Sequence, residues 1–496
     1  MIADTPEVDG SRREDRSLPE DFPVRRSGLE QEFFIVDQRG ALRDLADPFL
    51  RGCREAARAK GLDPHCFKAE SVKGLVEIIT PPSYDVKEMV SHYLSNLQLA
   101  LGVASELGLA LYPLGTYPLP ISSVFRDDPG YMVKASTIGH GRFSHAGRCA
   151  GAHLHLELPA GTVWPDVKAA LDAPVAAQRE LLGLYNLATA LDPALVALTR
   201  ACPFYEGRAG GFAARTVHYR GMLGLDGLYT NLQEVGALRT YATCVEDFID
   251  QQDERYRAWF AAMDRAGVDR RLFASTRGNL HRASWNPIRL NYRGTVEIRS
   301  MDANFPDVIL AVCALICGAV DRLRREHLRV RPTRQVRTIE LDGDELLVPH
   351  FSYVSDELLG AAVTHGVLDQ RIEAYLDSFV RFACAYVEEP DLVESLGCAG
   401  SGYKTTEGEV LRAFPPFEAT VSREQGLRLV RLSCHRLREQ VFSLNRRYRR
   451  ARQDGGHEKG NGVLPTSWKH FHNIPISQMP RVIPNEHRGS NDGGEC

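Results

Sequence analysis

Short apolar stretches, interrupted by polar residues and closed by turn residues, predict β-strands in the first two-thirds of the chain. In a strand, successive side chains point to opposite faces, so residues two apart share a face. Pro81 and Pro82 would stop the second of these strands, because proline cannot donate a ladder hydrogen bond. The predicted strands cover residues 29–37, 75–80, 109–114, 152–158 and 295–301.

Apolar residues at helical spacing predict helices between these strands and beyond them. Asp85 and Glu88 form a capping signature ahead of an apolar stripe, and Gly108 is placed to end that helix. Further helices are expected over about 165–200 and from Pro306 to about His327. Strands and helices are therefore mixed along the chain.

The chain is expected to consist of one large body between two weakly ordered tails. Residues 1–26 mix charged residues, Pro and Ser with few apolar ones, and residues 451–496 are rich in Gly, His, Asn and Pro. The body, 27–450, is expected to be mainly helical from about residue 335. Ser422 and Gln425 form a second capping pair in that region, ahead of an apolar stripe.

Composition excludes several classes of protein. The 496 residues include 60 Lys and Arg and 64 Asp and Glu, and this balance argues against a nucleic-acid scaffold. The 11 cysteines form no CxxC pair, which fits a reduced, cytoplasmic setting. The longest apolar stretch noted, about 308–320, is too short to span a membrane, and the N-terminus lacks the apolar core of a signal peptide.

The first strand carries two acids on one face. Glu30 and Glu32 are two apart, whereas Gln31, Phe33 and Ile35 take the other face. Two neighbouring carboxylates repel each other, and a hard divalent cation would relieve that repulsion. A solvent-facing edge strand would explain the same pattern.

A second acidic pair surrounds the next strand. Glu77 interrupts the apolar run LVEIIT, and Glu70 precedes it in the segment KAESVKG. Lys68 and Lys73 lie near enough in the sequence to pair with either carboxylate. A solvent-facing position would explain Glu77 as well as a ligand role does.

The strand GAHLHLEL places His153 and His155 on one face, with Glu157 continuing it. Two imidazoles on one face suit a metal or a phosphate. A cupin also has His-x-His after Gly, but Pro159 or Ala160 stands where its carboxylate is needed. Histidines satisfied within a core are the remaining alternative.

A carboxylate and a guanidinium share a face of the last strand, TVEIRSMD. Glu297 and Arg299 are two apart, and Arg289 and Arg293 lie just upstream. The pair fits a metal ligand beside an arginine that binds a phosphate. It fits a cross-strand ion pair equally well.

Taken in order, these motifs resemble the glutamate–cysteine ligase type 2 family, also called carboxylate–amine ligases, of the glutamine synthetase superfamily. The matching segments are GLEQEFFIVD, LVEIITPP, GAHLH, WNPIR and TVEIRSMD. FYEGRAGGFAARTVHYRG also resembles a family substrate-region segment, with Arg215 in it. The resemblance covers about residues 27–330. One departure is Gln31, where many members have a third acid, but it faces away from Glu30 and Glu32.

The resemblance implies an ATP-dependent ligase that joins a carboxylate to an amine through an acyl phosphate, with Mg²⁺ neutralising the phosphates. It implies small-molecule substrates, most simply glutamate with cysteine or another amine. Nucleic-acid and membrane partners are not expected, and the oligomeric state is open to a homo-oligomer. By position in the motifs, the resemblance implies one metal held by Glu32, Glu70 and Glu77, and a second held by Glu30, His153 and Glu297. It implies that His155 contacts the nucleotide and that Arg299 contacts the transferred phosphate. Arg289 and Arg215 would contact the substrate or a phosphate.

The fold implied by the resemblance is α+β: a glutamine synthetase-like curved antiparallel sheet that forms a funnel, with helices on its outer face. Two other functions stay open. Phosphotransfer to a nitrogen acceptor occurs on the same superfamily fold, so the fold does not exclude it. A catalytically silent, nucleotide-binding relative is the non-enzyme alternative.

Overall fold

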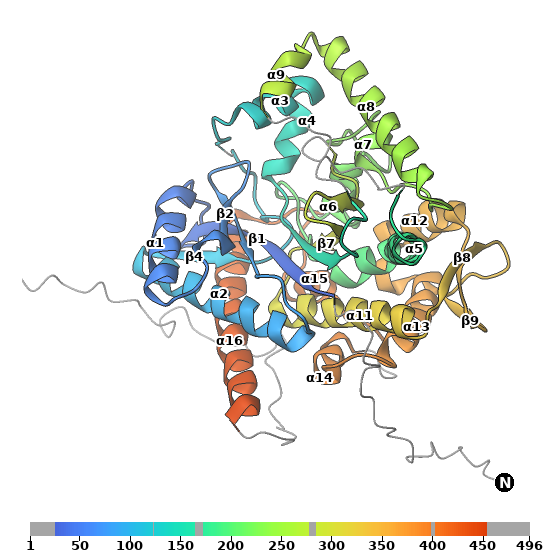
Figure 1. Ribbon diagram of the computed structural model, residues 1–496. Helices are drawn as coiled ribbons and strands as arrows, with labels where there is room; N and C mark the ends of the chain where they lie inside the picture. Colours follow the sequence, from blue (N-terminus) through green and yellow to red (C-terminus); the bar gives the residue numbers. More distant parts are fainter. Residues whose placement is uncertain (1–24, 123, 164–171, 277–283, 398–401, 454–496) are drawn as a thin grey trace, which may run out of the picture.

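The structure is a computed structural model (Figure 1). It describes residues 25–122, 124–163, 172–276, 284–397 and 402–453. The predicted tails, 1–26 and 451–496, lie outside the described residues except for residues 25, 26 and 451–453.

A seven-stranded sheet lies at the centre of the molecule. Its order is β2-β3-β1-β5-β7-β6, with β4 paired to the end of β1, and every pair is antiparallel. All five predicted strands are present, whereas β2 and β6 were not predicted. The strands are β1 (Ser27–Asp37), β2 (Phe67–Ala69), β3 (Leu75–Ile79), β4 (Leu109–Tyr112), β5 (Gly151–Glu157), β6 (Ile288–Asn291) and β7 (Thr295–Asp302).

Three long helices cover the apolar face of this sheet. α2 (Val86–Glu106) packs against β1, β3 and β4, and α5 (Val175–Thr199) packs against β6 and β7. α11 (Pro306–Arg325) packs in turn against α2 and α5. The Asp85 side chain accepts a hydrogen bond from Glu88 N at 2.6 Å, as the capping signature predicts. The predicted α+β class, an antiparallel sheet with helices on its outer face, is confirmed.

Gln31 lies on the helix-covered face, away from the acids, as predicted. Its amide nitrogen donates to Asn304 O at 2.7 Å, and its amide oxygen accepts a bond from the Tyr93 hydroxyl at 2.6 Å. The side chain is fully buried. Gln31 is therefore a satisfied polar group of the core, because both ends of its amide are hydrogen-bonded.

α5, which lies within the helix predicted over about 165–200, is long and apolar enough to cross a membrane by length and composition. The structure buries 94% of its most apolar stretch inside the protein. The helix begins at Val175, later than the predicted start near residue 165, although residues 164–171 are outside the described part. Burial of this kind is typical of the core helix of a globular body.

The last third of the chain adds helices and one small sheet. α16 (Arg423–Gln453) packs against α2 and β4, and the predicted capping pair is present, with Gln425 N donating to Ser422 Oγ at 3.2 Å. The small sheet was not predicted, because its strands are short and partly exposed; its members are β8 (Arg329–Thr333), β9 (Glu340–Asp342) and β10 (Glu345–Pro349) in the order β8-β10-β9.

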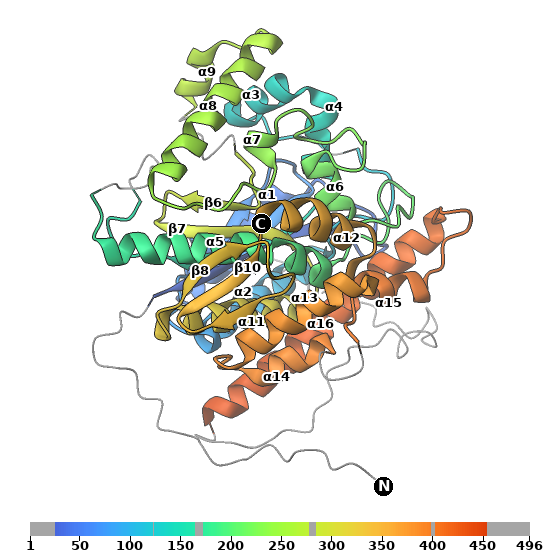
Figure 2. The same cartoon turned by 90° about the vertical axis from the view of Figure 1, so that its right-hand side faces the viewer.

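A separate apolar cluster forms at one end of the molecule, where α3, α4, α8 and α9 gather at the top of both views (Figures 1 and 2). Trp259, Phe143 and Tyr229 are its large buried members, and Trp285 packs at its edge. This cluster forms one wall of the cavity described below.

The helices of this cluster are α3 (Pro129–Ile138), α4 (His140–Phe143), α7 (Gln233–Gly236), α8 (Glu246–Ala266) and α9 (Arg270–Ser275). Elsewhere the chain also forms the helices α1 (Ala46–Ala59), α6 (Ala214–Arg220), α12 (Leu359–Thr364), α13 (Gln370–Cys384), α14 (Pro390–Val393) and α15 (Thr406–Ala413).

Candidate active site

Charged residues stand in cross-strand rows on the face of the sheet that the helices leave open. Strand pairing sets these rows, because residues directly opposite each other have Cβ atoms only about 5 Å apart. The alternation along each strand puts all of them on the same face. The rows are Lys68–Glu77–Glu32, Glu30–His153 and His155–Glu297–Arg289.

These rows form the floor of a cavity of about 230 Å³. Of the ten residues predicted for the site, nine line this cavity. His155 is the exception: its Nδ1 lies 3.0 Å from Thr295 Oγ1 and its Nε2 lies 3.4 Å from Glu30 Oε2. The nine are Glu30, Glu32, Glu70, Glu77, His153, Arg215, Arg289, Glu297 and Arg299.

Glu297 is surrounded by donors. Arg289 binds both of its oxygens, at 2.8 and 3.1 Å, and Asn291 Nδ2 donates at 2.6 Å. Arg299 forms a further ion pair with it. Burial by itself would raise the pKa of Glu297, but Arg289 and Arg299 hold it well below its ordinary value. This carboxylate is therefore ionised and already neutralised by the protein.

Among the described residues, Glu32 and Glu70 form no ion pair of this kind. Glu32 accepts a hydrogen bond from Gly151 N at 2.7 Å and Glu70 one from Ser71 N at 3.3 Å. Burial raises the pKa of Glu32 to about 7, against the opposing charge of Arg215. Burial and then the Glu32 carboxylate raise the pKa of Glu70 to about 8. Ionising both carboxylates is therefore unfavourable without a bound cation, and a cation would favour their charged forms.

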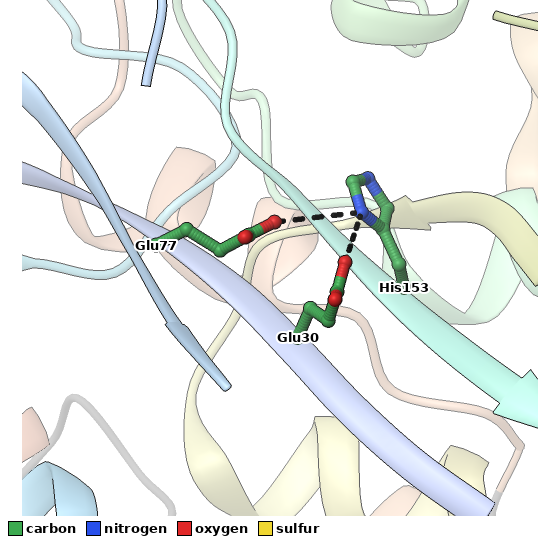
Figure 3. Close-up of side chains that lie close together, drawn as sticks. All are labelled: Glu30, Glu77 and His153. Atoms are coloured by element: carbon green, nitrogen blue, oxygen red, sulfur yellow. Dashed lines mark ion pairs between the residues drawn. The ribbon is translucent and has the colours of Figure 1, made fainter. Parts of the chain in front are cut away.

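Glu30, Glu77 and His153 point toward one another from three neighbouring strands (Figure 3). His153 Nδ1 lies 3.7 Å from Glu30 Oε2 and 3.9 Å from Glu77 Oε1. The His153 side chain is buried, and neither ring nitrogen has a hydrogen-bond partner in the described part of the chain. Burial and then the charge of Arg299 lower the pKa of His153 to about 3, so the imidazole is neutral.

These groups fit a divalent metal. A neutral imidazole and several carboxylates, of which Glu32 and Glu70 form no ion pair with a described residue, are the ligand types that such an ion takes. Ligand atoms within 4.8 Å of one another make three groups in the described residues. The first predicted ligand set coincides with one group, and the second set is divided between the other two. The groups are Glu32–Glu70–Glu77, Glu30–Glu77–His153 and Glu30–His155–Glu297.

The sequence model of the glutamate–cysteine ligase family 2 (GCS2) matches residues 26–352, which include every residue of the site. The chain belongs to this family. The match ends within the region of β10 and α12, so the helices from α12 onward lie beyond the part that defines the GCS2 family.

Curated relatives share less of their length with this GCS2 chain. A protein of Pseudomonas paraeruginosa named "Putative glutamate–cysteine ligase 2" is 29% identical over 189 residues, 38% of this chain and 44% of that protein. A Streptomyces avermitilis protein named "Putative glutamate–cysteine ligase 2-1" is 24% identical over 191 residues, 38% of this chain and 46% of its own length. The matched region thus spans less than half of either relative.

Two solved structures are similar at low identity. A bifunctional glutathione synthetase from Pasteurella multocida has a TM-score of 0.48 and 15% identity, over 84% of this chain and 52% of that chain. A glutamate–cysteine ligase from Francisella tularensis, solved in complex with AMP, has a TM-score of 0.41 and 12% identity, over 87% of this chain and 98% of that chain.

Arg215 of this GCS2 chain reaches the cavity from α6, outside the sheet. Its Nη2 donates to Arg299 O at 3.2 Å, and its Nη1 lies 4.0 Å from Asp302 Oδ1. The guanidinium also lies 5.3 Å from the centre of the Tyr219 ring. Arg215 therefore lies next to Arg299, and the charges of both arginines oppose the rise in pKa that burial causes at Glu32.

Several residues of the cavity were not predicted. Asn291 is two residues after Arg289, and this period of two is a signal that the sequence contains. Lys68 was expected only as a possible ion partner, and Arg293 was given only a place upstream of Glu297. Both contact Glu30, at 3.1 and 3.4 Å. The remaining members carry no period that points to a shared site; they are Ser71, Tyr131, Lys134, Ala146, Tyr219, Trp285 and Tyr292.

Proposed function

We propose that this chain is an ATP-dependent carboxylate–amine ligase. Membership of the GCS2 family supports a ligase, and one observation of the site carries the chemistry. The carboxylates Glu32 and Glu70, which form no ion pair with a described residue, lie in the same cavity as the guanidinium groups of Arg215 and Arg299. A cation-binding floor beside phosphate-binding arginines suits the γ-phosphate end of a nucleotide.

The proposed reaction has two steps. A carboxylate oxygen of the substrate attacks the γ-phosphorus of ATP, and the bond to the bridging oxygen breaks to release ADP. The amine then attacks the carbonyl carbon of the acyl phosphate, inorganic phosphate leaves, and the nitrogen loses a proton. The proposed substrates are glutamate and an amine such as cysteine.

The residues take the following roles in this proposal. Glu32, Glu70 and Glu77 would hold one Mg²⁺. Glu30 with the imidazole of His153 or His155 would hold another. Mg²⁺ supplies charge neutralisation at the crowded phosphate oxygens. Arg299 and Arg215 bind the phosphoryl group in transfer, and Arg289 keeps Glu297 ionised and oriented.

The direct test is ADP release from purified full-length protein with ATP, Mg²⁺, glutamate and a panel of amines. One or more amines should accelerate release. If no acid and amine in a broad panel stimulates it, the proposal is wrong.

Isotope transfer separates ligation from phosphotransfer to nitrogen. Glutamate labelled with ¹⁸O in its carboxylates should pass one label to inorganic phosphate, because the acyl–oxygen bond breaks in the second step. A stable phosphorylated nitrogen compound with unlabelled phosphate would instead identify a phosphotransferase.

A further inference from the structure

Lys68 occupies a position between two carboxylates of the floor. Its Nζ lies 3.1 Å from Glu30 Oε1 and 3.3 Å from Glu77 Oε2. The position follows from the register, since Lys68 stands directly opposite Glu77 across the β2–β3 ladder. The ammonium therefore lies between the Glu30 carboxylate of β1 and the Glu77 carboxylate of β3, on a side chain that is 30% exposed.

The same two carboxylates form a metal-ligand group with His153. Glu30 and Glu77 present their other oxygens, Oε2 and Oε1, to His153 Nδ1. His153 is 3% exposed, and no described residue forms a hydrogen bond with either of its ring nitrogens. A buried imidazole aimed at two acids is an incomplete coordination shell.

This group is shared with both of its neighbours. Glu77 also belongs to the group of Glu32 and Glu70, and Glu30 also belongs to the group of His155 and Glu297. A cation at Glu30 and Glu77 would therefore stand between the two outer positions. Three divalent ions here would place six positive charges beside the four arginines that line the cavity, Arg215, Arg289, Arg293 and Arg299.

We propose that Lys68 is a built-in cation that takes the place of a divalent ion at Glu30, Glu77 and His153, and so limits how many divalent ions the floor binds. A lysine ammonium is a compact charge on a flexible stem, which suits the narrow space between two carboxylates. It supplies one charge where a metal would supply two. The inference rests on the metal binding of the proposed function, and not on its substrates.

The test is to count Mn²⁺ ions bound to the full-length chain, from the loss of the free-ion signal in electron paramagnetic resonance. Lys68→Met keeps the length of the side chain and removes its charge. It should bind one more Mn²⁺ per chain than the wild type. Lys68→Arg keeps the charge and should bind the wild-type number.

Two further variants locate the additional ion. Lys73→Met is the matched control, because Lys73 is a half-buried lysine five residues away that does not line the cavity; it should bind the wild-type number. His153→Ala added to Lys68→Met should remove the extra ion. An unchanged count in Lys68→Met, or an extra ion that survives the loss of His153, overturns the proposal.

Thermal unfolding covers the case in which Lys68→Met folds poorly. Without divalent ions, the variant should unfold at a lower temperature than the wild type, and Mn²⁺ should raise that temperature more than it does for the wild type. A variant that Mn²⁺ does not recover would show a purely structural lysine and overturn the proposal. If Lys68→Met binds the additional Mn²⁺ but the wild-type chain releases no ADP with any acid and amine, this inference stands and the ligase proposal alone is overturned.

Discussion

The guanidinium of Arg215 lies directly against the backbone of Gly151: a Cβ atom at Gly151 would come within 2.2 Å of Arg215 Nη2. The same glycine donates its N–H to Glu32 Oε2 at 2.7 Å. One backbone position of β5 therefore sets the place of both an arginine and a metal-binding acid. The GAHLH motif begins with glycine because the arginine needs that space.

Gly151→Ala should displace Arg215 while leaving the fold largely intact, since the clash falls on the far end of a flexible side chain. A shift of about 1 Å at a catalytic group costs about 10²-fold in rate, and we expect a fall of that order in ADP release. Gly28→Ala is the control, because its Cβ would meet only Thr80 Oγ1, at 3.8 Å. Equal effects of the two substitutions on activity would contradict the role of Arg215.

Magnesium binding should release protons and strengthen as the pH rises. In the metal-free protein the pKa of Glu32 is raised to about 7 and that of Glu70 to about 8, from an ordinary 4.5. A metal binds the ionised form, so it must displace these protons. Calorimetry in buffers of different ionisation enthalpy measures their number, and zero released protons at about pH 6 would refute the prediction.

The same shifts predict how the stability of the metal-free protein depends on pH. Between the unfolded pKa of 4.5 and the folded values of about 7 and 8, the folded state binds more protons than the unfolded state. The free energy of unfolding should therefore fall as the pH rises through this window. Denaturant titrations should show a shallower dependence in Glu70→Gln, which cannot bind the extra proton. An equal slope would count against the raised pKa.

Glu297→Gln should remove most activity and also weaken the fold. The substitution takes a counter-ion from two buried arginines, Arg289 and Arg299. Breaking a buried pair costs about 3–5 kcal/mol, and we expect a loss of stability near the lower end because the amide retains one acceptor. Glu157→Gln is the control, because Glu157 pairs with Arg26 at the exposed edge. ADP release near the wild-type rate in Glu297→Gln would refute its role.

Gln31→Glu should lower stability and leave the activity of the folded protein unchanged. The new carboxylate would replace a buried amide that donates to Asn304 O, so one donor is lost and a charge is buried. A penalty of about 1–3 kcal/mol is expected from denaturant titration. An additional bound Mn²⁺ in this variant would show that position 31 reaches the cavity.

The helices beyond the GCS2 match should prove to be part of the same folding unit. Arg436 of α16 is 2% exposed; its Nη1 bonds Glu409 Oε2 at 2.9 Å, and its guanidinium lies 4.1 Å from the centre of the Phe305 ring. Arg436→Met should lower the free energy of unfolding by about 3–5 kcal/mol, because it leaves the half-buried Glu409 without its ion partner. Unfolding should remain a single cooperative transition. Arg438→Met serves as the control, because Arg438 is exposed. Two separate unfolding transitions would contradict the prediction.

The sequence determined which residues share a face within each strand. The pleat repeats every two residues whatever the strand packs against, so Glu30 with Glu32, His153 with His155, and Glu297 with Arg299 were predicted as pairs. The opposite face of Gln31 follows from the same rule. Helix caps at Asp85 and Ser422 were equally local, because the capping bond closes within three residues.

Only the tertiary structure decided which of these same-face pairs lie next to each other across strands, and which lysine or arginine contacts each acid. Register joins residues far apart in the chain, and long-range packing sets it, so the sequence did not show that Lys68 lies between Glu30 and Glu77. Strand register also places His153 and His155 in two different groups of possible metal ligands. Arg215 enters from a helix 64 residues after Gly151, and no local period connects them.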